Sequence, residues 1–158
     1  MKTIHVLALL LTTMLFTSCS NSSLDVVPPY LYTFHLKFVD AENNNVLEDL
    51  DANFLAASFS VAPSSKEEVE AFGVKSVKIG DELYLEVGVA SNPNKQLESI
   101  DFNLISEEIF NDDENHQVKT VWKWENRIDN TPFEIILGDR NLNSKVVTSS
   151  FKYFIVEL

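Results

Sequence analysis

The chain has 158 residues, a usual length for one domain. It is 45% hydrophobic and 11% aromatic, which excludes a disordered acidic tail and predicts a folded body. The whole chain has 12 basic and 24 acidic residues, and from residue 19 onward 11 basic residues leave a net charge of −13. Such a body repels phosphates, so nucleic acid is not expected as a partner.

The first 18 residues predict a secretory signal peptide. Lys2 supplies the positive charge, and the apolar stretch that follows it runs from Ile4 to Phe16. This stretch is shorter than the ~20 apolar residues that a membrane-spanning helix needs.

Phe16, Thr17 and Ser18 precede Cys19, the only cysteine of the chain. The run resembles the lipobox of bacterial lipoproteins, where an apolar residue, most often leucine, and two small residues precede an invariant cysteine. The resemblance implies cleavage after Ser18, diacylglycerol on the Cys19 thiol, and acylation of the new amino group by a fatty acid such as palmitate. Two or more acyl chains anchor a protein stably.

An ordinary signal peptide with an incidental cysteine is the alternative. By analogy with lipoprotein sorting in enteric bacteria, Ser20 after the cysteine implies the outer membrane. Whether the body faces the periplasm or the cell surface stays open.

Residues 19–29 then form the lipidated cysteine and a polar, flexible tether, and residues 30–158 a single domain. Ten extended residues reach about 35 Å at most.

Alternating apolar residues predict most of the strands. The strongest signal is Tyr30–Val39, with every second residue from Tyr30 to Phe38 apolar, and an Asx-rich turn follows at residues 40–45. Further strands are expected at residues 74–79, 83–89, 100–104, 118–125, 133–137 and 146–158. Residues 54–61 have a mixed pattern, in which Phe59 and Val61 alternate with Ser58 and Ser60 as in a strand edge. Both faces of residues 146–158 are apolar, which indicates a central strand.

One short helix is expected over residues 65–72. Ser65 and Glu68 match a capping box, and Val69 and Phe72 fall on one helical face before Gly73.

About eight strands with one short helix predict an all-β, antiparallel β-sandwich. The opening segment, YTFHLKFVDAENNNVL, also resembles the start of immunoglobulin-like or prealbumin-like surface modules in lipoproteins of gut bacteria. The resemblance implies one of those two sandwich types.

Catalytic signatures are missing from the sequence. It has no G-x-S-x-G, no H-E-x-x-H and no glycine-rich phosphate loop, so no enzyme activity and no cofactor are expected. His35 is expected to be a solvated surface residue on the polar face of its strand. Asp112, Asp113 and Glu114 offer hard oxygen ligands for calcium, but their spacing favours a solvated acidic loop.

Trp122 and Trp124 lie on one face of their predicted strand. Exposed together, they would form a stacking platform for glycans; buried, they are core residues, which Val118 on the same face favours.

The sequence therefore predicts a cell-envelope lipoprotein with a non-catalytic binding or assembly role. Its partner would be a glycan or an envelope protein. Two alternatives are a glycan-binding accessory module of a polysaccharide uptake system and a pilus or adhesin subunit.

Overall fold

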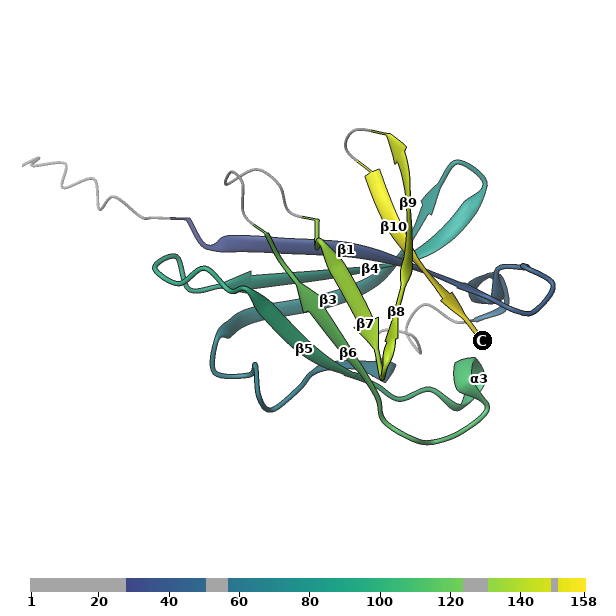
Figure 1. Ribbon diagram of the computed structural model, residues 1–158, viewed down its shortest axis with the longest axis horizontal. Helices are drawn as coiled ribbons and strands as arrows, with labels where there is room; N and C mark the ends of the chain where they lie inside the picture. Colours follow the sequence, from purple (N-terminus) through teal and green to yellow (C-terminus); the bar gives the residue numbers. More distant parts are fainter. Residues whose placement is uncertain (1–27, 51–56, 124–130, 149–150) are drawn as a thin grey trace, which may run out of the picture.

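The structure is a computed structural model that describes residues 28–50, 57–123, 131–148 and 151–158. Its strands form two five-stranded sheets (Figure 1). In sheet A the order is β3 (Val69–Ile79), β4 (Glu82–Ser91), β1 (Tyr30–Val39), β10 (Phe151–Glu157) and β9 (Asn143–Thr148). In sheet B it is β2 (Phe59–Val61), β5 (Ser99–Leu104), β6 (His116–Val121), β7 (Glu134–Leu137) and β8 (Arg140–Asn141).

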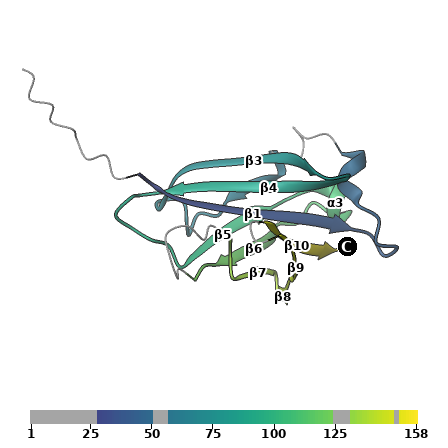
Figure 2. The same cartoon turned by 90° about the horizontal axis from the view of Figure 1, so that it is seen from above.

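The two sheets face each other as the layers of a sandwich, with β3, β4 and β1 in one layer and β5, β6 and β7 in the other (Figure 2). The core between them is rich in aromatic side chains. The ring of Phe102 on β5 lies 5.5 Å from the ring centroids of both Phe34 and Phe59, and 6.0 Å from that of Phe72. The all-β architecture expected from the alternating pattern is therefore confirmed at the level of two packed sheets.

Strand β1 has the predicted bounds, and its residues Tyr32, Phe34, Leu36 and Phe38 are buried. The hydroxyl of Tyr32 accepts a hydrogen bond from the backbone N–H of Leu97 at 2.7 Å. The turn after β1 also forms as expected, because the Asp40 carboxylate accepts hydrogen bonds from the backbone N–H and the side-chain amide of Asn44.

Among the described strands, pairing is antiparallel except between β1 and β10. β1 and β10 run parallel, with Leu36 opposite Phe154 and Val39 opposite Glu157. The sheets are therefore mostly antiparallel, with this one parallel pair among the described strands. The first and last strands of the domain meet in the middle of sheet A, where Phe154 and Val156 add to the core.

The helix expected over residues 65–72 is wrong. Residues 63–68 form turns, and β3 begins at Val69. The Ser65 hydroxyl accepts a hydrogen bond from the Asp101 backbone N–H at 3.0 Å and caps no helix. Helical segments occur instead at η1 (Val46–Asp49), a 3-10 turn, and at α3 (Glu107–Phe110), a single α-helical turn.

The single strand expected over residues 146–158 is also wrong. It is replaced by β9 and β10, which pair as a hairpin with Lys145 opposite Tyr153. β10 lies between β1 and β9 and is central, as its two apolar faces predict, whereas β9 is an edge. Together with the two-residue strand β8, this division brings the described strands to ten.

Candidate functional site

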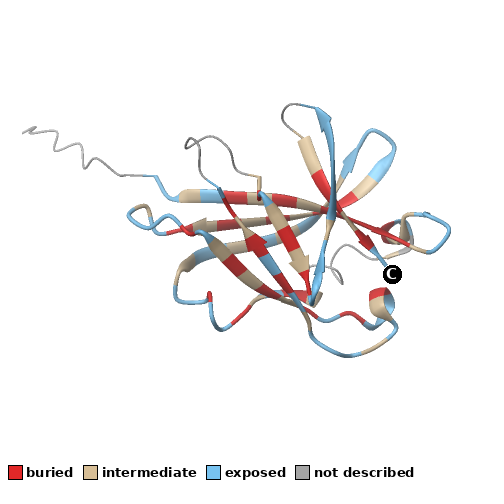
Figure 3. Ribbon diagram, viewed as in Figure 1, coloured by how far each residue is buried: buried red, intermediate tan, exposed pale blue. Residues whose placement is uncertain are grey.

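Among the described strands, β9 is the longest whose residues are all exposed. All six of its residues are exposed, and its side chains include Val146, 67% exposed, and Val147, 54% exposed (Figure 3). Within the described residues, β9 pairs on one side only, with β10. An edge strand of this kind presents unpaired backbone N–H and C=O groups and is a template for another strand.

The exposure of β9 follows from how the chain crosses between the sheets. After the two-residue strand β8, the last of sheet B, the chain passes Leu142 and enters β9 of sheet A. Val146 lies opposite Lys152, and Ser144 lies opposite the core residue Phe154, so both are on the side of sheet A that faces the core. Sheet B ends at β8, and Val146 remains uncovered although it faces inward.

The other described edges are better protected. β2 and β8 have only three and two residues. β3 has 11 residues but contains a register shift between Val69 and Ala71, and Lys78 lies opposite Leu83 on the face that also holds Phe72 and Val74. Short length, bulges and inward-pointing lysines are the features by which edge strands avoid pairing. β9 also has a register shift, at Phe151/Lys152, but it combines length with two exposed valines.

A hollow of about 470 Å³ lies beside β9. Its lining comes from β7, the β8–β9 crossing and β10, namely Phe133, Glu134, Asn141, Leu142, Asn143, Ser144 and Phe154. Lys152 lies next to Phe154, one of the lining residues. Its Nζ is 4.5 Å from the ring centroid of Phe154 and donates a hydrogen bond to the carbonyl of Pro132 at 3.2 Å. The hollow therefore offers the exposed ring of Phe133 and several side-chain amide groups next to the edge. We call β9 and this hollow the β9 site.

The outer face of sheet A carries a second polar group of side chains. The Nε2 atom of His35 lies 3.1 Å from a carboxylate oxygen of Glu86, whose other oxygen is 2.8 Å from the Nζ of Lys75. The His35 ring also packs edge-on against Phe151 at 4.9 Å. His35 is thus half-buried and paired, and the surface position expected for it is wrong, because its strand lies in the interior of the sheet between β4 and β10.

Burial and hydrogen bonding set the protonation of this group. Burial lowers the pKa of His35 and outweighs the hydrogen bond to Glu86, which raises it. Burial would raise the pKa of Glu86, but the hydrogen bonds from Lys75 and His35 bring it below its ordinary value. Next to it, Glu82 accepts hydrogen bonds from Lys37 and Tyr84, each at 2.8 Å, which lower its pKa.

These shifts predict a loss of stability as the pH falls below about 6.5, the ordinary pKa of histidine. The folded chain binds the His35 proton less readily than the unfolded chain, so this contribution is complete above pH 6.5 and is lost as the pH falls through the lowered pKa of the folded state. Urea unfolding between pH 7.5 and pH 5 measures it. The His35→Gln variant is expected to show a flatter profile in this range, and an unchanged slope would contradict the assignment.

Trp122 belongs to the core. It is 4% exposed, its Nε1 donates to the Thr120 hydroxyl at 2.9 Å, and its ring packs edge-on against Tyr32 at 5.0 Å. Its buried indole offers no ring face to a glycan. Trp124 lies outside the described residues, so the predicted pairing of the two tryptophans stays a prediction.

The acidic residues Asp112, Asp113 and Glu114 do not converge on a metal position. The carboxylate of Asp112 accepts a hydrogen bond from the Glu114 backbone N–H at 3.1 Å and lies 2.8 Å from the Nε2 of His116. The ring of His116 stacks on Phe110 at 3.7 Å. In the part of the chain that the structure describes, no three His, Cys, Asp or Glu side chains group so as to hold a metal ion.

Cys19, the predicted site of lipid attachment, and its neighbours lie outside the described residues. No described helix is both long and apolar enough to cross a bilayer. Comparison with known proteins adds no relative. No family model, curated protein or solved structure matches the chain. The function therefore has to be inferred from the residues and their geometry alone.

The β9 site was not among the residues singled out from the sequence. Val146 and Val147 fall in the strand predicted over residues 146–158, whose two apolar faces are typical of a strand buried on both sides. One local signal was available: from Arg140 to Val156 the chain has no acidic residue, which sets this stretch apart from the rest of an acidic protein.

Proposed function

We propose that the protein is an outer-membrane lipoprotein, anchored through Cys19, with a non-catalytic binding or assembly role in which a partner strand adds to β9. The lipobox-like run before Cys19 supports the anchor, and the missing catalytic motifs support a non-catalytic role. The exposure of all six residues of β9 is the observation that carries the binding role.

Strand addition fits the geometry of this edge. In this mode the main chain of the partner supplies hydrogen bonds along the edge, and its alternate side chains supply specificity. β9 has six residues, which is a usual strand length. The two exposed valines give apolar area that a partner strand would remove from water, at about 25 cal/mol for each Å².

We further propose that the sandwich is of the immunoglobulin-like or prealbumin-like type. Two five-stranded sheets of mainly antiparallel strands, packed over an aromatic core, support this assignment. An experimental structure with a different order of strands in either sheet would contradict it.

A photo-crosslinking residue at position 147 tests the proposed binding. Val147 is 54% exposed on β9, and Leu31, 53% exposed on the interior strand β1, is a control of equal exposure. In intact envelopes of cells that make the full lipoprotein, we expect a discrete cross-linked species from position 147 and little from position 31. A species that contains only this chain indicates assembly, and one that contains a second protein indicates a binding module.

Two outcomes contradict the proposal. Equal cross-linking at both positions would show that exposure alone determines capture, and cross-linking at position 31 alone would place the contact on the outer face of sheet A.

A further inference from the structure

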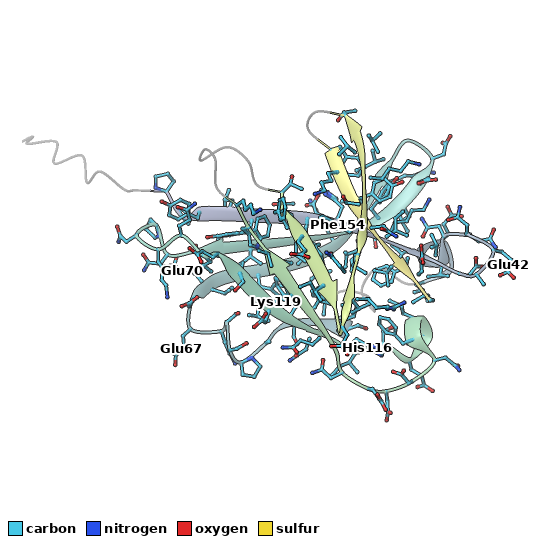
Figure 4. The ribbon with its side chains drawn as sticks, in the orientation of Figure 1. Glu42, Glu67, Glu70, His116, Lys119 and Phe154 are labelled. Carbon is cyan, nitrogen blue, oxygen red and sulfur yellow. The ribbon has the colours of Figure 1, made fainter. Side chains whose placement is uncertain are left out.

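The charges around β9 differ from those of the rest of the protein. Residues 19–158 have a net charge of −13, yet the stretch from Arg140 to Val156 contains three basic residues and no acidic one. The labelled acidic residues Glu42, Glu67 and Glu70 lie at the two far ends of the molecule, away from Phe154 of the β9 site (Figure 4). This stretch is therefore locally cationic, although Glu134 lines the adjacent hollow and Asp139 and Glu157 flank the stretch in the sequence.

The basic side chains are placed along both faces of the edge. Lys145 lies opposite Tyr153, on the outer face, whereas Lys152 lies opposite Val146 on the inner face. Arg140 precedes β9 and donates to the Glu157 carbonyl at 3.3 Å. Among the described residues, neither Lys145 nor Arg140 has a carboxylate oxygen within 4 Å, although Lys145 is near enough to Glu82 to help lower its pKa.

A second copy of this chain fits the β9 edge poorly. Two β9 strands paired about a two-fold axis would bring the two Lys145 side chains toward each other. The other long edge of the same sheet, β3, carries Lys75, whose charge is paired with Glu86, and Lys78, against the single β3 carboxylate of Glu70. Pairing either edge with β9 places like charges together, which disfavours self-assembly.

We infer that β9 takes up an extended acidic segment of another protein. This inference rests on the proposed strand addition and specifies the chemistry of the strand that is added. Carboxylates on the added strand would meet Lys145 on one face and approach Lys152 on the other. Lysine on an edge strand disfavours pairing with neutral or basic strands. Lys145 on β9 would therefore favour an acidic partner strand over other strands.

Short peptides test the inference on the mature lipidated protein in neutral detergent. Three fluorescent peptides share a framework of alternating valine and threonine and carry two glutamates, two glutamines or two lysines. Fluorescence anisotropy is expected to show tightest binding for the glutamate peptide, about three- to tenfold tighter than for the lysine peptide, since each exposed ion pair contributes modestly. The preference should decrease at high salt.

Matched variants locate the binding. Lys145→Gln is expected to reduce the preference for the glutamate peptide by severalfold. Lys119→Gln is the control, because Lys119 is an exposed lysine of β6 in the other sheet. Val146→Asp places a carboxylate on β9 and is expected to weaken binding of the glutamate peptide more than binding of the other two peptides.

The outcomes separate the inference from the proposed function. If all three peptides bind equally and Val146→Asp weakens each of them, β9 accepts strands without regard to charge, and the inference fails while strand addition stands. If no peptide binds, or if neither Lys145→Gln nor Val146→Asp changes the binding, strand addition and the inference fail together. A preference that Lys119→Gln reduces as much as Lys145→Gln would also overturn the inference.

Discussion

The Phe102→Ala variant is expected to lower the free energy of unfolding by about 3–5 kcal/mol, the usual effect of removing a buried aromatic side chain. Phe102 is fully buried on β5 and joins the two sheets, because its ring contacts those of Phe34 and Phe72 in sheet A and Phe59 in sheet B. The chain has a single cysteine and therefore no internal disulfide to compensate. Domains are usually stable by only 5–15 kcal/mol, so the loss is a large fraction of the total.

Urea unfolding with tryptophan fluorescence measures this effect, because Trp122 lies in the same core. Phe133→Ala is the matched control: Phe133 is 55% exposed, and its ring is covered on one side by Lys123, whose Nζ lies 3.5 Å from the centroid. For this control, the free energy of unfolding is expected to fall by less than about 1 kcal/mol, the strength of an exposed cation–π contact. Equal losses for the two variants would contradict the assignment of Phe102 to the core.

The alternating strands were predictable because their burial is local. β1 matches its expected bounds to the residue, and Ile100, Phe102 and Leu104 of β5 face the core in the expected alternation. One side of each strand is apolar and faces the opposite sheet. Apolar and polar residues then alternate along the strand with a period of two, which can be recognised in the sequence.

The incorrect helix at residues 65–72 has a specific cause. The register shift between Val69 and Ala71 inserts one extra residue into β3, so Val69 pairs with Ser91 and Phe72 with Val89. Two residues that are three apart therefore face the same side of the sheet, which is the spacing of one helical face. A bulge in a strand and a turn of helix are indistinguishable at this spacing, and only the pairing with β4 decides between them.

The β9 site was hidden for a different reason. Exposure of Val146 depends on where sheet B ends, and the two-residue length of β8 is a tertiary property without a local pattern. The parallel pairing of β1 with β10 likewise joins residues more than 100 positions apart. Chain-crossing geometry and sheet edges of this kind follow from the assembled fold and not from periodicity.

Replacing Cys19 with alanine is expected to abolish lipid attachment completely. In the proposed anchoring, the Cys19 thiol is the acceptor of diacylglycerol, and the chain has no other cysteine to replace it. Metabolic labelling with a fatty acid is expected to tag the wild-type protein and the Ser20→Ala control, but not Cys19→Ala. An untagged wild-type protein, or a tagged Cys19→Ala variant, would contradict the proposed anchor.

The proposed anchoring at Cys19 also predicts where residues 19–158 reside. With 11 basic and 24 acidic residues beyond residue 18, the body is repelled by anionic headgroups, so without acyl chains it has no electrostatic attraction to the membrane. When residues 19–158 are exported behind a conventional cleavable signal peptide, Cys19→Ala is expected to leave the protein in the soluble fraction. Retention in the membrane pellet after a high-salt wash would mean that a surface of the sandwich itself binds the envelope, and the anchoring role of Cys19 would then be redundant.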